Sequence, residues 1–194
     1  GGSADGAAAL RLLARLWGIK HADAKLAEVA AEIGSDVAAC LRGRPCDVVG
    51  AGDTVEPAPE LADGHAVLIN PGVALATGDV FAALDESPGP ASAVARLVPP
   101  VSGIEDLVGQ LLARSNDLER IAIVLAPEIR LALQALSGLP GCLLARMSGS
   151  GATCFGLFAR AAEAAAGAAM LEQAYDDWWV RATAFVCEPS GAGS

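Results

Sequence analysis

The sequence predicts an α+β fold in two domains. Apolar residues recur at helical spacing over residues 4–41, and the first strand-like apolar run begins at residue 65. A stretch rich in Gly, Pro, Asp and Glu, residues 46–64, separates the two regions. Apolar residues make up 53% of the 194 and charged residues 19%, which is typical of a folded chain. We therefore expect one domain over residues 1–60 and a second over residues 61–194.

The first predicted helix spans residues 4–17. Gly18 marks its end, because glycine commonly follows the last helical residue. Arg11 and Arg15 face away from its apolar side. The residues that recur at helical spacing are Leu10, Leu13, Ala14 and Trp17.

Two shorter helices follow in the first region. The second has Asp23 as a candidate N-cap and ends at Gly34, with an apolar side of Leu26, Val29, Ala30 and Ile33. Ser35 and Asp36 then precede an apolar segment, residues 37–41. This order places a carboxylate at a helix N-terminus.

The second region begins with a strand and a helix. Residues 65–70 (HAVLIN) predict a buried strand that ends at Pro71 and Gly72. Thr77 is a candidate N-cap of a helix whose apolar residues are Val80, Phe81 and Leu84. The stretch ESPGPAS after it predicts a loop.

The rest of the second region predicts helices, a hairpin, a helix and a strand. One helical face runs from Ile104 to Leu112 and is interrupted at Asn116 and Asp117, and another helix follows Pro127. Two strand-like runs flank Ser148–Gly151, as in a hairpin. An Ala-rich helix over residues 160–174 and a last strand, WWVRATAFV, complete the order. A strand, helices, a hairpin, a helix and a strand make a ferredoxin-like α+β sandwich.

Composition argues against several partners. The formal net charge of −10 disfavours nucleic acid and anionic membrane surfaces. Lys20 and Lys25 are the only lysines and lie close together, so no distant catalytic lysine is available. No apolar run is long enough to span a bilayer, and nothing resembles a secretory signal. We expect a cytoplasmic protein without a membrane partner.

The cysteines do not predict a metal site. The chain has five, at Cys40, Cys46, Cys142, Cys154 and Cys187. They form no C-x-x-C pair and have no metal-like spacing with the two histidines. We expect reduced thiols in the core and no metal bound by protein ligands alone.

The opening sequence GGSADGAAAL has the form of a phosphate-binding segment. A glycine-rich turn that leads into a helix presents free backbone N–H groups and the positive end of the helix dipole, which bind phosphate oxygens without a lysine. The sequence holds no Walker motif, and neither glycine segment fits G-x-G-x-x-G. A plain turn before a helix is the alternative.

Two other segments are candidates for chemistry. Asp36 at a helix start is able to accept a proton or to interact with a metal-bound nucleotide, and the alternative is a plain N-cap. The small residues of Ser148–Gly151 allow a ligand to approach the backbone, and the alternative is a tight hairpin turn. A serine hydrolase is disfavoured, because G-x-S-x-G is absent and neither His21 nor His65 has a triad context.

Taken in order, five segments resemble the GHMP family of small-molecule kinases over nearly the whole chain. They are GGSADGAAALRLL, AEIGSDVAACLRG, VLINPGVALATGDVFAAL, SNDLE and RMSGSGATCFGLF. The likeness is greatest to the members that act on a cytidine-diphosphate sugar alcohol. The resemblance implies a two-domain GHMP kinase fold, in which the end of an N-terminal domain (ribosomal S5 domain 2-like) precedes the ferredoxin-like C-terminal domain.

The resemblance also implies an activity. Members of this branch transfer the γ-phosphoryl group of ATP, usually with Mg²⁺, to the 2-hydroxyl of cytidine-diphosphate methylerythritol in the non-mevalonate pathway of isoprenoid and terpenoid biosynthesis. Asp36 matches the family's catalytic aspartate, which accepts or orients the hydroxyl proton. The last positions of the ATP phosphate cradle would be Gly1, Gly2, Ser3 and Ala4.

The resemblance places substrate contacts in the second domain. Thr77 and Phe81 would contact the substrate, with the Phe81 ring near the cytosine, and a core position is the alternative for Phe81. The third glycine motif, which faces the active-site cleft in the family and would have a supporting role, matches Ser148, Gly149, Ser150 and Gly151.

The sequence also departs from the family. Ala38 stands where the family usually has Pro, and Ala39 and Cys40 stand where aromatic residues are common, so we expect a different pocket wall beside Asp36. The family's segments before the cradle, including a catalytic lysine, do not occur here. We therefore expect an incomplete fragment of the enzyme, inactive or nearly so alone, with uncovered apolar faces on its first two helices.

Two other readings remain at this point. The acceptor could be homoserine, mevalonate or a sugar, which other GHMP kinases phosphorylate. The chain could also be a truncated binding or interaction protein without catalytic activity. We expect a monomer or a homodimer.

Overall fold

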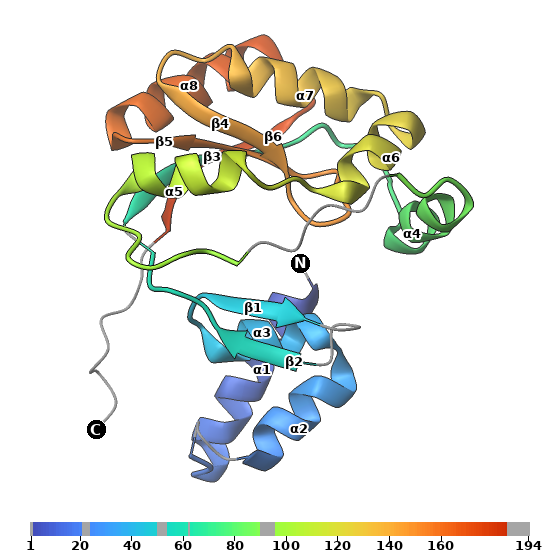
Figure 1. The fold of residues 1–194 in the computed structure, drawn as a ribbon, viewed down its shortest axis with the longest axis vertical. Helices are drawn as coiled ribbons and strands as arrows, with labels where there is room; N and C mark the ends of the chain where they lie inside the picture. Colours follow the sequence, from blue (N-terminus) through green and yellow to red (C-terminus); the bar gives the residue numbers. More distant parts are fainter. Residues whose placement is uncertain (1, 21–23, 50–53, 62, 90–95, 186–194) are drawn as a thin grey trace. The chain divides into compact units, whose positions relative to one another are not determined.

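The computed structural model describes residues 2–20, 24–49, 54–61, 63–89 and 96–185 (Figure 1). The chain divides into two compact units after Glu60, and Arg96–Pro100 belongs with the first unit. Each unit has its own cluster of buried apolar residues. The assignment of domains to residues 1–60 and 61–194 stays a prediction.

The first unit consists of helices and a two-stranded sheet. Its elements are α1 (Gly2–Trp17), α2 (Ala24–Ile33), α3 (Ser35–Arg42), β1 (Cys46–Val49) and β2 (Thr54–Pro57). Both α1 and α2 pack on α3. The buried residues between them are Ala7, Ala14, Leu26, Ala30, Val37 and Leu41.

The buried side of α1 agrees with the predicted one only in part: Ala14 is buried and Leu10 packs against the buried cluster, whereas Leu13 and Trp17 are exposed. Ala7 and Ala14 are buried, whereas Trp17 is 66% exposed. Arg11 lies on the buried side and donates hydrogen bonds to the carbonyl groups of Cys40 and Leu41. Small residues allow two helices to approach closely, so this contact selects alanine over the larger apolar residues. The large apolar residues that remain exposed on α1 and α2 are Leu12, Leu13, Leu16, Trp17, Val29 and Ile33.

The hairpin of β1 and β2 lies in a stretch that the sequence predicted to be irregular. The strands pair antiparallel from Cys46 opposite Pro57 to Val49 opposite Thr54. The Arg42 guanidinium on α3 donates to the Val55 carbonyl at 2.7 Å. Strands of only four residues are too short to give a periodic signal, and their backbone hydrogen bonds form only in the folded pair.

The second unit contains the four-stranded sheet. Its strands are β3 (Gly64–Asn70), β4 (Cys142–Met147), β5 (Cys154–Phe158) and β6 (Trp179–Phe185). Its helices are α4 (Thr77–Glu86), α5 (Ile104–Leu112), α6 (Asp117–Leu125), α7 (Glu128–Ser137) and α8 (Ala161–Ala174). No helix within the described ranges is long and apolar enough to cross a membrane.

The strand order confirms the ferredoxin-like prediction. The order is β4-β5-β3-β6, and every neighbouring pair is antiparallel. Helices α7 and α8 cover one face of the sheet, and α5 lies against the other (Figure 1). The sequence missed one helix, α6, which begins at the predicted interruption because Asn116 caps it by accepting a hydrogen bond from Leu118 N.

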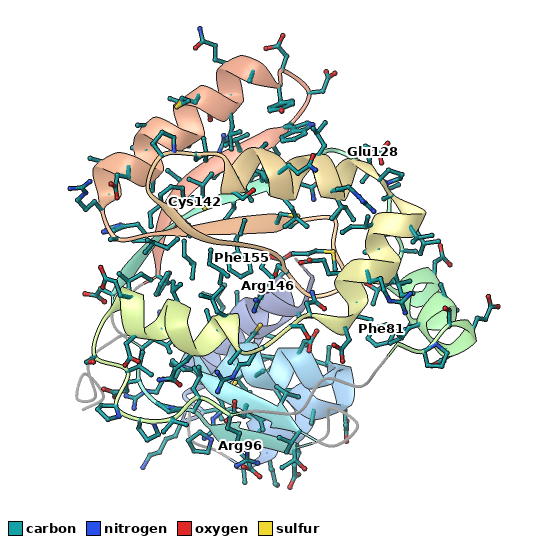
Figure 2. All side chains as sticks on the ribbon, turned by 45° about the horizontal axis from the view of Figure 1, so that its top comes forward. Phe81, Arg96, Glu128, Cys142, Arg146 and Phe155 are labelled. Carbon is teal, nitrogen blue, oxygen red and sulfur yellow. The ribbon has the colours of Figure 1, made fainter. Side chains whose placement is uncertain are left out.

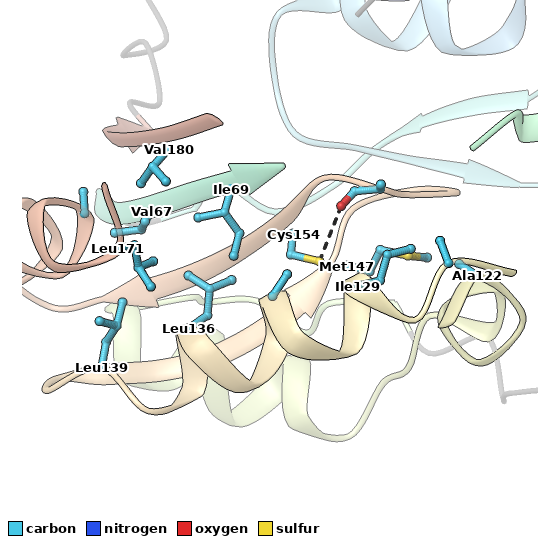
Figure 3. Packing of buried hydrophobic residues seen from close by; sticks show 14 of the residues in the cluster. Val67, Ile69, Ala122, Ile129, Leu136, Leu139, Met147, Cys154, Leu171 and Val180 are labelled. Atoms are coloured by element: carbon cyan, nitrogen blue, oxygen red, sulfur yellow. Dashed lines mark hydrogen bonds between the residues drawn. The ribbon is translucent and has the colours of Figure 1, made fainter. Parts of the chain in front are cut away.

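The core of the second unit lies between the sheet and helices α7 and α8 (Figure 3). Alternate residues of β3 face this core, and Val67 and Ile69 are fully buried. Glycine lets helix α8 approach closely, because a Cβ on Gly167 would lie 3.0 Å from a Leu139 methyl group. The largest fully buried side chains are Phe158, Ile69, Ile129, Leu136, Met147, Val67, Val80, Val180 and Cys154.

The prediction of core thiols holds for one cysteine. Cys154 is buried, whereas Cys40, Cys46 and Cys142 are partly exposed, and all four are free thiols. Cys187 lies outside the described residues. Burial raises the pKa of the Cys154 thiol to about 12, and the negative charge of Glu119 adds to this effect.

We predict that truncating a core leucine of α7 destabilises the second unit far more than truncating a surface leucine of the same helix. Leu136 is fully buried and Leu131 is 45% exposed. Leu136→Ala should lower the free energy of unfolding by about 3 kcal/mol, and Leu131→Ala by less than about 1 kcal/mol. Urea unfolding followed by circular dichroism measures both. Equal losses in the two variants would contradict the packing described here.

We predict that Cys154 resists alkylation in the folded protein. At pH 8 its buried thiol is protonated, and the thiolate is the reactive form. Iodoacetamide labelling followed by peptide mass spectrometry should modify partly exposed Cys40 first and Cys154 only after unfolding in urea. Labelling of both at the same rate in the native protein would show that Cys154 is accessible.

The same thiol makes stability depend on pH at the alkaline end. The folded pKa is about 12, above an unfolded value of about 8.5. The stabilisation is therefore fully present below the unfolded pKa and is lost as the pH rises toward the folded pKa. Cys154→Ala should make unfolding less sensitive to pH in that interval, which alkaline urea titrations can measure.

Candidate active site

The glycine segment between β4 and β5 forms a tight turn. Ser148 N donates to Thr153 O at 2.9 Å, and Gly151 N donates to Ser148 O at 3.0 Å. Gly149 and Gly151 have φ values of 56° and 90°, which side chains rarely adopt. A Cβ on Gly149 would meet open space, whereas one on Gly151 would lie 2.8 Å from the Met147 sulfur. The segment is thus both a hairpin turn and a place where a ligand can approach the backbone at Gly149.

Asparagine side chains from other elements attach this turn to the unit. The Asn116 amide donates to the Met147 carbonyl at 3.1 Å and to the Gly149 carbonyl at 2.8 Å. The Asn70 amide at the end of β3 donates to Thr153 Oγ1 at 3.0 Å. The turn is therefore tied to both α6 and β3.

Helix α4 also reaches the turn. Thr77 Oγ1 and Ser150 Oγ lie 2.9 Å apart and share a hydrogen bond. The prediction that Thr77 caps α4 is wrong: Ala76 occupies the N-cap position without a side-chain hydrogen bond, and Thr77 is the first helical residue. Because its hydroxyl contacts Ser150 instead, two of the predicted substrate residues meet across separate segments.

Phe81 is not a core residue. It lies on α4 (Figure 2) and is 49% exposed, whereas Val80 beside it is fully buried. Phe81 follows Thr77 by four residues, so the two share one side of the helix. An exposed aromatic ring on the side of the helix that carries Thr77 is available for a planar ligand.

Asp36 lies in the first turn of α3. Gly34 occupies the N-cap position of this helix without a side-chain hydrogen bond, so the interpretation of Asp36 as a plain N-cap is wrong. Its side chain is exposed and, within the part of the chain that the structure describes, makes no hydrogen bond or ion pair. The carboxylate is therefore free to accept a proton from a bound molecule.

The predicted phosphate cradle lies inside a helix rather than before it. Gly2, Ser3 and Ala4 form the first turn of α1, and Gly1 lies outside the described residues. The first N–H groups of a helix have no partner within the helix and carry the positive end of its dipole. The structure thus places these residues in the first turn of a helix instead of in a turn before it, and their role in binding phosphate stays a prediction.

Helices α1 and α3 run in the same direction. A Cβ on Gly6 would lie 3.6 Å from Val37, near the start of both helices. Further along, Arg11 contacts the carbonyl groups of Cys40 and Leu41. Their N-termini therefore lie at the same end of the first unit, which brings Ser3, Ala4 and Asp36 to one end of the helix pair.

The described residues hold no complete metal site. No group of three or more His, Cys, Asp or Glu side chains within them is arranged to hold a metal ion. A Mg²⁺ ion commonly binds through one or two carboxylates and the phosphates of a nucleotide. The carboxylates in the first turns of the two helices are Asp5 on α1 and Asp36 on α3, and both are exposed.

The predicted site residues thus form two groups in different units. The group of the first unit is Gly2, Ser3, Ala4 and Asp36, and the group of the second unit is Thr77, Phe81, Ser148, Gly149, Ser150 and Gly151.

Sequence reasoning missed the residues that support the turn. They are Asn70, Asn116, Glu119 and Thr153. One signal was present: Asn116 followed three residues later by Glu119 is the N-terminal pattern of a helix. Glu119, however, accepts a hydrogen bond from Met147 N at 3.0 Å, a contact that no local pattern indicates.

Comparison with protein families identifies two matching regions. Residues 1–44 match the N-terminal domain of GHMP kinases. Residues 102–177 match the C-terminal region of GHMP kinases. Asp36 lies in the first region, and Asn116 and the glycine turn lie in the second.

Curated relatives match over nearly the whole chain. A 4-diphosphocytidyl-2-C-methyl-D-erythritol kinase of Parvibaculum lavamentivorans is 45% identical over 95% of the chain, which covers 63% of that relative. A kinase of the same name from Paramagnetospirillum magneticum is 47% identical over 93% of the chain and is covered to 62%. The chain thus spans a little over three-fifths of the length of these relatives.

A solved structure has the same fold. A crystal structure of 4-(cytidine 5'-diphospho)-2C-methyl-D-erythritol kinase matches with a TM-score of 0.70 and 30% identity, over 94% of this chain and 64% of that one. The strand order, the two family regions and these relatives agree. The chain therefore belongs to the GHMP kinase family.

Proposed function

We propose that the protein containing this chain is an ATP-dependent kinase. It transfers the γ-phosphoryl group of ATP to the 2-hydroxyl of 4-diphosphocytidyl-2-C-methyl-D-erythritol, a step of the non-mevalonate pathway to isoprenoids. The observation that carries the choice of substrate is the identity of 45% and 47% to relatives with this kinase name. A cytoplasmic location is part of the proposal, because the phosphoryl donor ATP is supplied there.

The catalytic role falls to Asp36. Its exposed carboxylate would accept the proton of the acceptor hydroxyl while the hydroxyl oxygen bonds to the γ-phosphorus and ADP leaves. The placement of Asp36 in the first turn of α3, without a partner among the described residues, supports this role.

The phosphates would be held by backbone groups rather than by lysine. The first turn of α1, with Gly2, Ser3 and Ala4, presents N–H groups at the same end as Asp36. Bound Mg²⁺ supplies charge neutralisation on the transferring phosphoryl group. The carboxylates that would be available to such an ion are Asp5, in the first turn of α1, and Asp36, in the first turn of α3.

The cytidine moiety would be recognised in the second unit. The half-exposed Phe81 ring offers a surface on which a base can stack. Thr77 and Ser150, joined by their hydroxyl groups, offer donors and acceptors to the polar part of the substrate. The substrate would also lie close to the backbone of the turn at Gly149, because the space beside this residue is open.

A substrate panel tests the proposed acceptor. The protein is assayed for ADP formation with 4-diphosphocytidyl-2-C-methyl-D-erythritol, homoserine, mevalonate and galactose. We expect turnover with the cytidine-diphosphate compound alone. Turnover with another acceptor would support the kinase activity but contradict the proposed substrate. ATP binding without turnover of any acceptor would favour a non-catalytic role.

We predict that Asp36→Asn lowers kcat by about a hundred-fold or more, because general base catalysis contributes that much. The substitution keeps the shape of the side chain and removes its basicity. Glu28→Gln makes the same change at an exposed position on α2 and should leave kcat unchanged. Full activity of Asp36→Asn would show that another group accepts the proton.

We predict that Phe81→Ala raises KM for the cytidine substrate by about ten-fold, since stacking of a base on an aromatic ring contributes about 1–3 kcal/mol. KM for ATP should stay the same, and Phe81→Tyr should retain low KM because it keeps the ring. Val124→Ala, at a side chain 70% exposed on α6, is the control. A wild-type KM in Phe81→Ala would exclude the stacking role.

A further inference from the structure

We propose that Asn116 is a positioning residue that fixes the glycine turn, Ser148–Gly151, to the first turn of helix α6. The inference rests on the proposed function for what the turn does, and on geometry alone for how the turn is held. No sequence motif for ATP or cytidine assigns this role to Asn116.

The Asn116 side chain uses all of its polar atoms. Its Oδ1 accepts from Leu118 N at 3.1 Å and caps α6. Its Nδ2 donates to Met147 O at 3.1 Å and to Gly149 O at 2.8 Å. An exchange of Oδ1 and Nδ2 would place an oxygen against two carbonyl oxygens, so these contacts fix the orientation of the amide.

Helix α6 takes the place of a neighbouring strand at the end of β4. Met147 is the last residue of this strand, and β4 is an edge strand of the sheet. Its N–H donates to Glu119 Oε2 at 3.0 Å, and its C=O accepts from Asn116. Both polar groups of Met147 are therefore satisfied by side chains three residues apart on α6, which share one side of the helix.

The contact with Gly149 extends this support into the turn itself. The hydrogen bonds of Ser148 N and Gly151 N stay within residues 148–153 and do not attach the turn to a helix. Glycine loses more conformational freedom on folding than other residues, so a turn with two glycines at positive φ needs external contacts to stay in one conformation. Asn116 supplies such a contact between Ser148 and Ser150.

The position of Ser150 depends on the same contact. Ser150 shares a hydrogen bond with Thr77 at the start of α4, and α6 also holds the far end of α4, because Arg120 donates to the Ser87 carbonyl at 2.8 Å. Helix α6 thus contacts both segments that carry the proposed substrate contacts. We infer that it sets the distance between the glycine turn and the helix that carries Phe81.

The test uses two substitutions that keep the helix cap. Asn116→Ser and Asn116→Asp both leave an oxygen that can accept from Leu118 N. Serine is too short to reach the turn, and aspartate offers no donor to the two carbonyl groups. Amide hydrogen exchange should become about ten-fold faster at Ser148 and Gly151 in both variants, with exchange in α6 and the melting temperature near wild-type values.

The matched control is Asn70→Asp. Asn70 also contacts the turn region, but its partner is the Thr153 hydroxyl, which can donate to a carboxylate in place of the lost amide. The backbone contact from Gly72 N to the side-chain oxygen is kept as well. Amide hydrogen exchange at Ser148 and Gly151 should therefore stay near wild-type rates, although Asn70→Asp introduces the same negative charge as Asn116→Asp.

The kinetic arm separates positioning from stability. Both Asn116 variants should lose about ten-fold in kcat/KM for the cytidine substrate, mostly through KM, with KM for ATP unchanged. Unchanged exchange in both variants overturns the proposal, as does faster exchange in Asn116→Asp alone, which would reflect charge repulsion. Faster exchange with wild-type kinetics overturns the functional part. If the wild-type protein phosphorylates no cytidine substrate, the proposed function fails while the exchange data still decide how the turn is held.

Discussion

The second unit depends on hydrogen bonds to the backbone groups at the end of the edge strand β4. At Met147, β4 has no further strand beside it, and its N–H and C=O groups bind Glu119 and Asn116 of α6. Unpaired backbone groups in a folded protein are costly, so this contact fixes the end of the strand and the glycine turn that follows. The turn then holds Ser150 against Thr77, which brings α4 into the same region.

The first unit follows a different constraint, the close approach of two parallel helices. Small residues on α1, such as Ala7 and Ala14, let it lie against α3. Because the helices run in the same direction, their N-termini meet at one end, and Asp36 stands beside the first turn of α1. In the proposed function, the two positive helix ends bind the phosphates and Asp36 accepts the hydroxyl proton.

Much of the second unit could be predicted because its elements have strong local signals. The apolar run at residues 65–70 forms the strand β3, with Ala66, Val67 and Ile69 buried, and α7 follows Pro127 as expected. The β1 and β2 hairpin was not predictable, since four-residue strands have no periodicity of their own. Helix α6 was missed because Asn116 was interpreted as the end of one helix rather than the cap of the next.

The sequence alone determined the four strands of the larger sheet and every helix except α6, and it placed Asp36 near a helix start, because periodicity and end signals are local properties of the chain. Only the tertiary structure decided which side of α1 is buried and that Trp17 is exposed, since this depends on the surface that α3 presents. It also decided that Asn116 binds Met147 at the end of β4 and Gly149 in the glycine turn, 31 and 33 residues away. Contacts between distant segments exist only once the chain has folded, so no local pattern encodes them.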